Sequence, residues 1–91
     1  MNQGLNILIV DDDRRMTRTL GDILTMSGHN VTESSSGPDA LEKASGFAFD
    51  CVLTDIKMPE MDGVELHRRL RDIQPGLPVL LMTAYAADEL I

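Results

Sequence analysis

The chain has 91 residues, enough for one small domain with a single hydrophobic core. It is 43% hydrophobic and 25% charged, as globular proteins are, and no apolar run reaches membrane-spanning length. The formal net charge of −7 argues against a nucleic-acid surface, because phosphate binding requires clustered Lys and Arg. Neither a membrane nor nucleic acid is therefore expected as a direct partner. The single Cys51 lies in an apolar segment, so we expect a buried core residue in a cytoplasmic protein.

Hydrophobic periodicity predicts strands that alternate with helices. Runs of Val, Ile and Leu without polar alternation are typical of buried parallel strands, and apolar residues at steps of three and four are typical of helices. Strands are predicted at 5–10, 30–33, 50–54 and 78–82. Helices are predicted at 14–27, 36–46 and 64–73, followed by a loop at 83–85 and one helical turn at 86–91. This alternation predicts an α/β fold with a doubly wound parallel sheet, covered on both faces by right-handed crossovers.

The ends of the predicted helices carry recognisable signals. Gly28 follows the first helix as a stop signal, and Pro38 suits the first turn of the second. In the third helix, Leu66, Leu70 and Ile73 share one face, which we expect to point inward.

Acidic residues come directly after two of the predicted strands. Asp11 and Asp12 follow the first strand, Asp55 follows the third, and Thr83 follows the fourth. Because ligands bind beyond the carboxyl ends of strands in such sheets, we expect these side chains at one edge. Three carboxylates in one small volume repel one another and are costly to desolvate unless a cation binds between them.

This set of carboxylates suits Mg²⁺, which prefers hard oxygen ligands. His29 and His67 fall on a turn and on a helix face, so we expect ordinary surface residues rather than zinc ligands. Asp55 at a strand end is placed as an oxygen nucleophile for phosphoryl transfer, and the Thr83 hydroxyl could donate a hydrogen bond to a phosphoryl oxygen.

Three motifs, in order and spacing, resemble the receiver domain of two-component response regulators. They are ILIVDDD at 7–13, DIKMPEMDG at 55–63 and LLMTAY at 80–85. The resemblance implies a flavodoxin-like, CheY-like sheet with strand order 2-1-3-4, and a regulatory domain rather than an enzyme. It implies only self-catalysed phosphotransfer and slow autodephosphorylation.

The same resemblance implies roles for individual residues. Asp55 would accept a phosphoryl group from a sensor histidine kinase or another phosphohistidine donor. Asp11, Asp12, Asp55 and the backbone carbonyl of Lys57 would hold Mg²⁺, and Thr83 would respond to the phosphoryl group. Asp13 has no role in the family pattern, and we interpret it as a helix cap.

The chain departs from the family at its end. Receiver domains have a fifth strand followed by a phosphate-contacting Lys, whereas this sequence stops at Ile91 within the expected fourth helix. We therefore expect residues 1–91 to form an incomplete receiver domain that lacks the fifth strand and the last helix. Because the fourth strand would then have an unpaired edge, we expect self-association around Val79–Met82, as a homodimer or by exchange of elements.

The sequence leaves alternatives to a phospho-accepting switch. A receiver-like protein-binding module that is not phosphorylated is the main alternative, because the phosphate-contacting Lys is absent. A haloacid-dehalogenase-like phosphatase has the Asp-x-Asp spacing of Asp11 and Asp13, but Arg14 follows where a small residue is required. A nucleotide-binding domain is disfavoured because no Gly-rich loop follows the first strand.

Overall fold

The computed structural model describes residues 4–82, so the loop predicted at 83–85 and the helical turn predicted at 86–91 lie outside the described residues. Within residues 4–82, strands and helices alternate strictly. In chain order they are β1 (Asn6–Val10), α1 (Arg14–Met26), β2 (Asn30–Ser34), α2 (Gly37–Gly46), β3 (Cys51–Asp55), α3 (Gly63–Ile73) and β4 (Val79–Met82).

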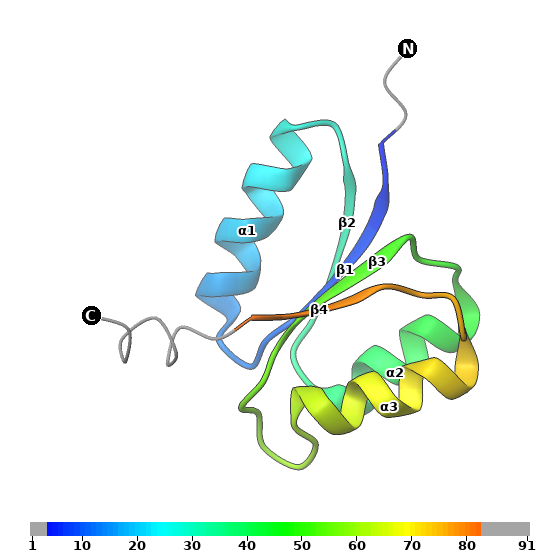
Figure 1. Cartoon of the computed structure of the whole chain (residues 1–91). Coiled ribbons are helices and arrows are strands. Elements are labelled where there is room, and N and C mark those ends of the chain that lie inside the picture. Colours follow the sequence, from blue (N-terminus) through cyan, green and yellow to red (C-terminus); the bar gives the residue numbers. More distant parts are fainter. Residues whose placement is uncertain (1–3, 83–91) are drawn as a thin grey trace.

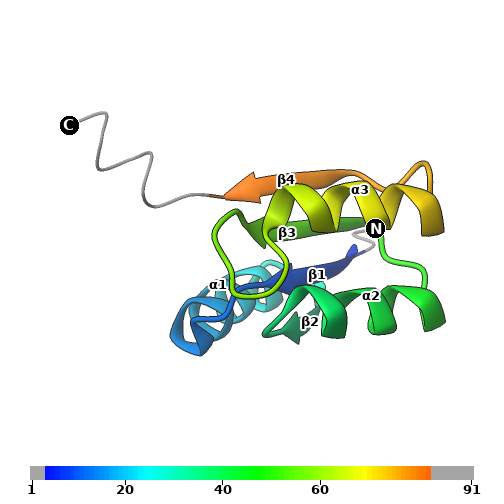
Figure 2. The same ribbon diagram turned by 90° about the horizontal axis from the view of Figure 1, so that it is seen from below.

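The strands form one parallel sheet in the order β2-β1-β3-β4, as predicted. Helix α1 covers one face of this sheet, whereas α2 and α3 lie side by side on the other (Figures 1 and 2). The predicted doubly wound α/β class is therefore confirmed. Because all strands run the same way, their carboxyl ends share one edge of the sheet.

Side chains cap the helices where the sequence indicated. The Asp13 carboxylate accepts a hydrogen bond from the Arg15 N–H at 2.9 Å, so Asp13 is the N-cap of α1. Ser36 caps α2 through its hydroxyl oxygen, which accepts from the Asp39 N–H at 3.2 Å. Gly28 follows α1 with a φ of 94°, a conformation that favours glycine. These contacts satisfy backbone groups that helix ends leave unpaired.

The main core lies between the sheet and the α2–α3 layer. Its buried members come from two strands, two helices and the segment before β3, and they are Leu8, Val10, Ala40, Ala44, Phe49, Val52, Leu66 and Leu70. Ile7 and Ile9 are equally buried but alternate with Leu8 and Val10, so they point to the opposite face, where α1 lies. Strand β1 is thus covered on both sides.

Three expectations need correction. Asp55 is the last residue of β3, in register with Met82, rather than the first residue of a loop. Ile73 is 39% exposed, because it is the last residue of α3 and lies beyond the core that buries Leu66 and Leu70. Cys51, the first residue of β3, is half-buried instead of fully buried.

Strand β4 is also more exposed than its apolar sequence suggests. Leu80 is 57% exposed and Leu81 is 42% exposed, whereas Val79 packs against the core. The expectation that each apolar strand is covered on both faces therefore fails for β4, because α1, the described helix on one face of the sheet, packs over β1 and β2.

Candidate functional site

Three carboxylates meet at the carboxyl edge of the sheet. One oxygen from each of Asp11, Asp12 and Asp55 lies within 4.8 Å of the other two. Asp11 is buried, Asp55 is half-buried and Asp12 is exposed, so the group spans the boundary between core and solvent. A pocket of about 210 Å³ opens over them, and its lining also includes Asp13, Met16 and Met82. The three carboxylates therefore converge in the structure, as predicted.

Strand β1 and its neighbour β2 fix the position of Asp11. The Asp11 N–H donates to the carbonyl oxygen of Ser34 at 3.1 Å, which continues the β1–β2 pairing one residue beyond β1. The Asp11 carboxylate then accepts the Asp13 N–H at 2.9 Å. Both the backbone and the side chain of Asp11 are thus held, and one carboxylate oxygen remains for another ligand.

The turn after β3 fixes Asp55 in a similar way. The Asp55 carboxylate accepts the Ile56 N–H at 2.9 Å, and the Ile56 carbonyl accepts the Gly63 N–H at 2.7 Å. A side chain at Gly63 would collide with the carbonyl oxygen of Asp55 and would lie 3.0 Å from the Ile56 Cα. A glycine is therefore required at the first residue of α3, because the helix begins in close contact with the backbone of Asp55.

The electrostatics of the pocket favour a cation. Burial raises the pKa of Asp11 above its ordinary value, the negative charges of Asp55 and Asp12 raise it further, and the Asp13 N–H opposes both effects. A divalent metal would offset the repulsion and desolvation that raise this pKa. Three hard oxygen donors that converge in a polar pocket match the donor set of Mg²⁺.

The other predicted site residues have different outcomes. Lys57 lies in the loop between β3 and α3, close in sequence to Asp55. Thr83 directly follows β4 but lies outside the described residues, so its role stays a prediction. Among residues 4–82, neither His29 nor His67 joins a cluster with metal-ligand geometry. No helix in the same range is both long and apolar enough to cross a membrane.

Sequence reasoning missed two residues that support the acids. Ser34 is only 3% exposed, and its carbonyl holds the Asp11 N–H. Its position opposite Val10, at the end of the neighbouring strand, is the signal that would have identified it. Gly63 ends the motif at 55–63, but its contact with Asp55 depends on the path of the loop, which no local sequence pattern reveals.

The sequence matches the family model for the response regulator receiver domain over residues 7–91. Among curated relatives, the response regulator receiver protein CpdR of Brucella abortus is 43% identical over 81 residues, which cover 89% of this chain and 68% of CpdR. The transcriptional regulatory protein ZraR of Escherichia coli strain K12 is 40% identical over 88 residues, which cover 97% of this chain but only 20% of ZraR. The chain thus spans about a fifth of such longer regulators.

Solved structures agree with this assignment. A CheY-like receiver domain protein from Methanospirillum hungatei superposes with a TM-score of 0.87 at 33% identity, over 96% of this chain and 70% of that one. The response regulator protein TrrA from Thermotoga maritima, solved in complex with Mg²⁺ and BeF, gives a TM-score of 0.86 at 30% identity, over 91% of this chain and 72% of that one. The fold, the motifs and the family match lead to one conclusion: the chain belongs to the response regulator receiver domain family.

Proposed function

We propose that Asp55 accepts a phosphoryl group from the phosphohistidine of a sensor histidine kinase, in a reaction that depends on Mg²⁺. The observation that carries this proposal is the approach of Asp11, Asp12 and Asp55 to within 4.8 Å of one another. Such proximity raises the free energy of the ionised carboxylates, so a purely structural role does not account for it. The chain would act as a signalling switch, and its chemistry would be limited to phosphotransfer to itself and slow loss of the phosphate.

Each residue has a distinct task in the proposed reaction. A carboxylate oxygen of Asp55 forms a bond to phosphorus while the bond from phosphorus to the donor nitrogen breaks, and the electron pair of that bond stays on the imidazole. Asp11, Asp12, Asp55 and the Lys57 backbone carbonyl would hold Mg²⁺, which would neutralise charge on the transferring group. The Thr83 hydroxyl would donate to a phosphoryl oxygen.

Related proteins support this assignment. TrrA, whose fold matches this chain closely, was solved with Mg²⁺ and BeF. Family membership supports an aspartyl phosphate, and ZraR, which is much longer than this chain, is a transcriptional regulatory protein. A nucleic-acid contact, if a full-length form makes one, would therefore belong to a segment outside the receiver fold.

Mass spectrometry after incubation with Mg²⁺ and a small phosphodonor tests the proposal. The wild type should gain one phosphoryl group, Asp55→Asn should gain none, and omission of Mg²⁺ should suppress the gain. Asp22→Asn is the matched control, because Asp22 is an exposed aspartate on α1 outside the acidic pocket, and it should behave like the wild type.

Equal labelling of the wild type and Asp55→Asn would contradict the proposal. A chain that is stabilised by Mg²⁺ but never gains the phosphoryl mass would instead favour a receiver-like binding module. Self-association through Val79–Met82 stays a prediction, as does the incomplete domain. Sedimentation at high protein concentration tests the first of these, and a strictly monomeric profile would count against it.

A further inference from the structure

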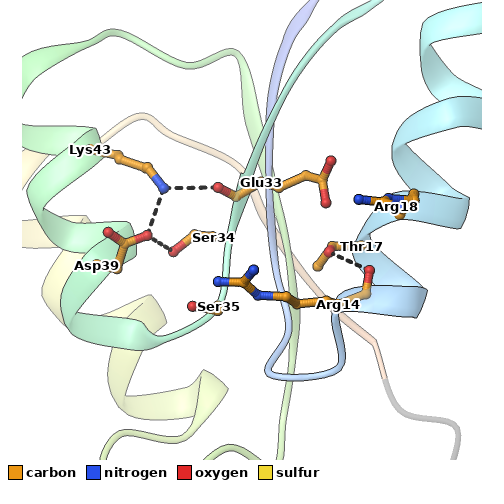
Figure 3. Close-up of a pocket in the computed structure, with 8 residues that line it drawn as sticks. All are labelled: Arg14, Thr17, Arg18, Glu33, Ser34, Ser35, Asp39 and Lys43. Carbon is orange, nitrogen blue, oxygen red and sulfur yellow. Dashed lines mark hydrogen bonds and ion pairs between the residues drawn. The ribbon is translucent and has the colours of Figure 1, made fainter.

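A compact polar cluster joins the end of β2 to α2. The buried Ser34 hydroxyl donates to the Asp39 carboxylate at 2.6 Å, and the Lys43 ammonium contacts the same carboxylate oxygen at 2.7 Å. Lys43 also donates to the carbonyl oxygen of Glu33 at 2.9 Å. Figure 3 shows these contacts in a pocket of about 400 Å³ between α1 and α2. These contacts connect the last two residues of β2 to the first two turns of α2 across the intervening turn.

The Ser34–Asp39–Lys43 cluster reaches the acidic pocket through one backbone bond. The carbonyl oxygen of Ser34 accepts the Asp11 N–H at 3.1 Å, and Ser34 is the last residue of β2. A strand end that frays would move this carbonyl, because β2 lies at the edge of the sheet and has a neighbour on one side only. The cluster fastens that end from the side opposite to β1.

We infer that Ser34, Asp39 and Lys43 form a positioning network that holds the backbone of Asp11 in place for metal binding. The significance for Mg²⁺ rests on the proposed function, whereas the positioning itself does not. None of the three side chains lines the acidic pocket, so they would act only through the Ser34 carbonyl. They are therefore positioning residues and not ligands.

The charge states of the cluster favour its persistence. Hydrogen bonds from Lys43 and Ser34 lower the pKa of Asp39, so its carboxylate is ionised at neutral pH. The pair is partly open to solvent, with side-chain exposures of 38% for Lys43 and 40% for Asp39. Ser34 is 3% exposed, which makes its short bond to Asp39 the protected part of the cluster.

Two variants test the inference, and each has a matched control. Ser34→Ala removes the hydroxyl, and Ser45→Ala removes a similar hydroxyl that bonds within α2 to the Leu41 carbonyl at 2.8 Å. Lys43→Gln breaks the i,i+4 ion pair with Asp39, which is 2.7 Å long, and Arg69→Gln breaks the i,i+4 pair between Arg69 and Glu65 on α3, which is 2.8 Å long. Each control variant removes a comparable contact elsewhere on α2 or α3 but leaves the contacts at the end of β2 unchanged.

The first measurement is amide hydrogen exchange of the metal-free 91-residue chain by NMR. In Ser34→Ala and Lys43→Gln, the Asp11 N–H should exchange about fivefold faster, because its acceptor is less firmly held. The Leu8 amide, in the middle of β1, should be unaffected in both variants. Unchanged Asp11 exchange, or equal acceleration at Leu8, would overturn the inference, since the first means no coupling and the second means general destabilisation.

The second measurement is the affinity for Mg²⁺ alone, from chemical shifts during titration. Both variants should bind Mg²⁺ about fivefold more weakly than the wild type, less than the roughly 10- to 100-fold loss expected when a direct outer-shell partner is removed. The Ser45→Ala and Arg69→Gln chains should match the wild type, and unchanged affinity in the two test variants would also overturn the inference. If the wild type shows no response to Mg²⁺, the proposed function fails, while the exchange data still decide whether Asp11 is positioned by this network.

Discussion

The acids at the carboxyl edge of the sheet and the paired acids of α2 and α3 occupy opposite environments. At the edge, burial and the charges of Asp12 and Asp55 raise the pKa of Asp11. On the helices, Lys43 and Ser34 lower the pKa of Asp39, and Arg69 and Arg68 lower that of Glu65. The acids that stabilise the fold thus form ion pairs with basic residues of their own helix, whereas the edge acids follow or end separate strands and destabilise one another.

The backbone differs between the two regions in the same sense. Around Asp55, the chain makes a close approach at Gly63 and adopts a positive φ of 69° at Glu60. Helices α2 and α3 have capped N-termini and i,i+4 ion pairs. The molecule therefore concentrates local strain and like charge at the edge where the proposed chemistry takes place, which is common at functional sites.

The largest expected effect comes from filling the contact at Gly63. Gly63→Ala places a methyl group against the Asp55 carbonyl, so either α3 or the end of β3 must shift, and we expect a loss of about 3 kcal/mol in the free energy of unfolding. In a domain of this size, each kcal/mol of lost stability lowers the melting temperature by about 4–8 °C. Calorimetry would detect the resulting shift.

Gly46→Ala is the control for this change. Gly46 ends α2, and a Cβ built there meets no atom within 4 Å, so stability should change by less than about 0.5 kcal/mol. If Gly63→Ala behaves like Gly46→Ala, the two regions do not differ in how tightly their backbones pack.

Neutralising an edge acid should have the next largest effect and the opposite sign. Asp11→Asn removes one of three like charges and keeps an oxygen for the Asp13 N–H, so the metal-free protein should gain about 1 kcal/mol. Mg²⁺ should raise the melting temperature of the wild type by mass action and that of the variant much less.

Thermal melts with and without Mg²⁺ measure both effects, and Asp22→Asn on α1 serves as the control with an exposed acid. A destabilised, metal-free Asp11→Asn would show that the edge acids do not repel one another enough to matter. Indifference of the wild type to Mg²⁺ would argue that no cation binds there.

Sequence patterns captured the parts of this molecule that depend on local chemistry and on strand direction. The parallel order brings Asp11 and Asp55 together whatever the details of packing, and the Asp13 cap follows from side-chain chemistry alone. Ile73 shows the limit, because helical periodicity marks a face but does not say where the core ends along it. Ser34 was missed because its place beside Asp11 depends on the register of β1 and β2, and Gly63 because its contact with Asp55 depends on the path of the loop between them.

A paired acid should respond to substitution and to pH in the reverse direction from Asp11. Asp39→Asn should cost only about 0.5 kcal/mol at neutral pH, because solvent screens a pair as exposed as Asp39 and Lys43. Since the folded pKa of Asp39 lies below the usual 3.8, its contribution is fully present above about pH 4 and is lost as the pH falls through the folded value.

Denaturant melts across this pH range give a paired test of Asp39→Asn and Asp11→Asn. The folded pKa of Asp11 is raised, so its penalty is fully present above that pKa and disappears as the pH falls toward 3.8. Relative to the wild type, Asp39→Asn should therefore start less stable and Asp11→Asn more stable, and both differences should shrink in acid. Differences of the same sign at neutral pH would remove the contrast between the two regions.

The last expected effect, as small as that of Asp39→Asn, concerns the backbone of the loop between β3 and α3. Glu60 adopts a φ of 69°, which side chains disfavour, so Glu60→Gly should stabilise the protein by about 0.5 kcal/mol once the added freedom of the unfolded chain is subtracted. Denaturant unfolding measures the difference, provided that the slope with denaturant is unchanged.

The same substitution on a helix supplies the control. Glu42 lies exposed within α2, where Glu42→Gly should cost about 1 kcal/mol, because glycine is a poor helix former. Opposite signs for one chemical change at two exposed positions would locate the backbone strain in the loop that carries Asp55 toward α3. If Glu60→Gly also destabilises, the positive φ at Glu60 is offset by contacts of its side chain, and the difference between the two regions is one of charge alone.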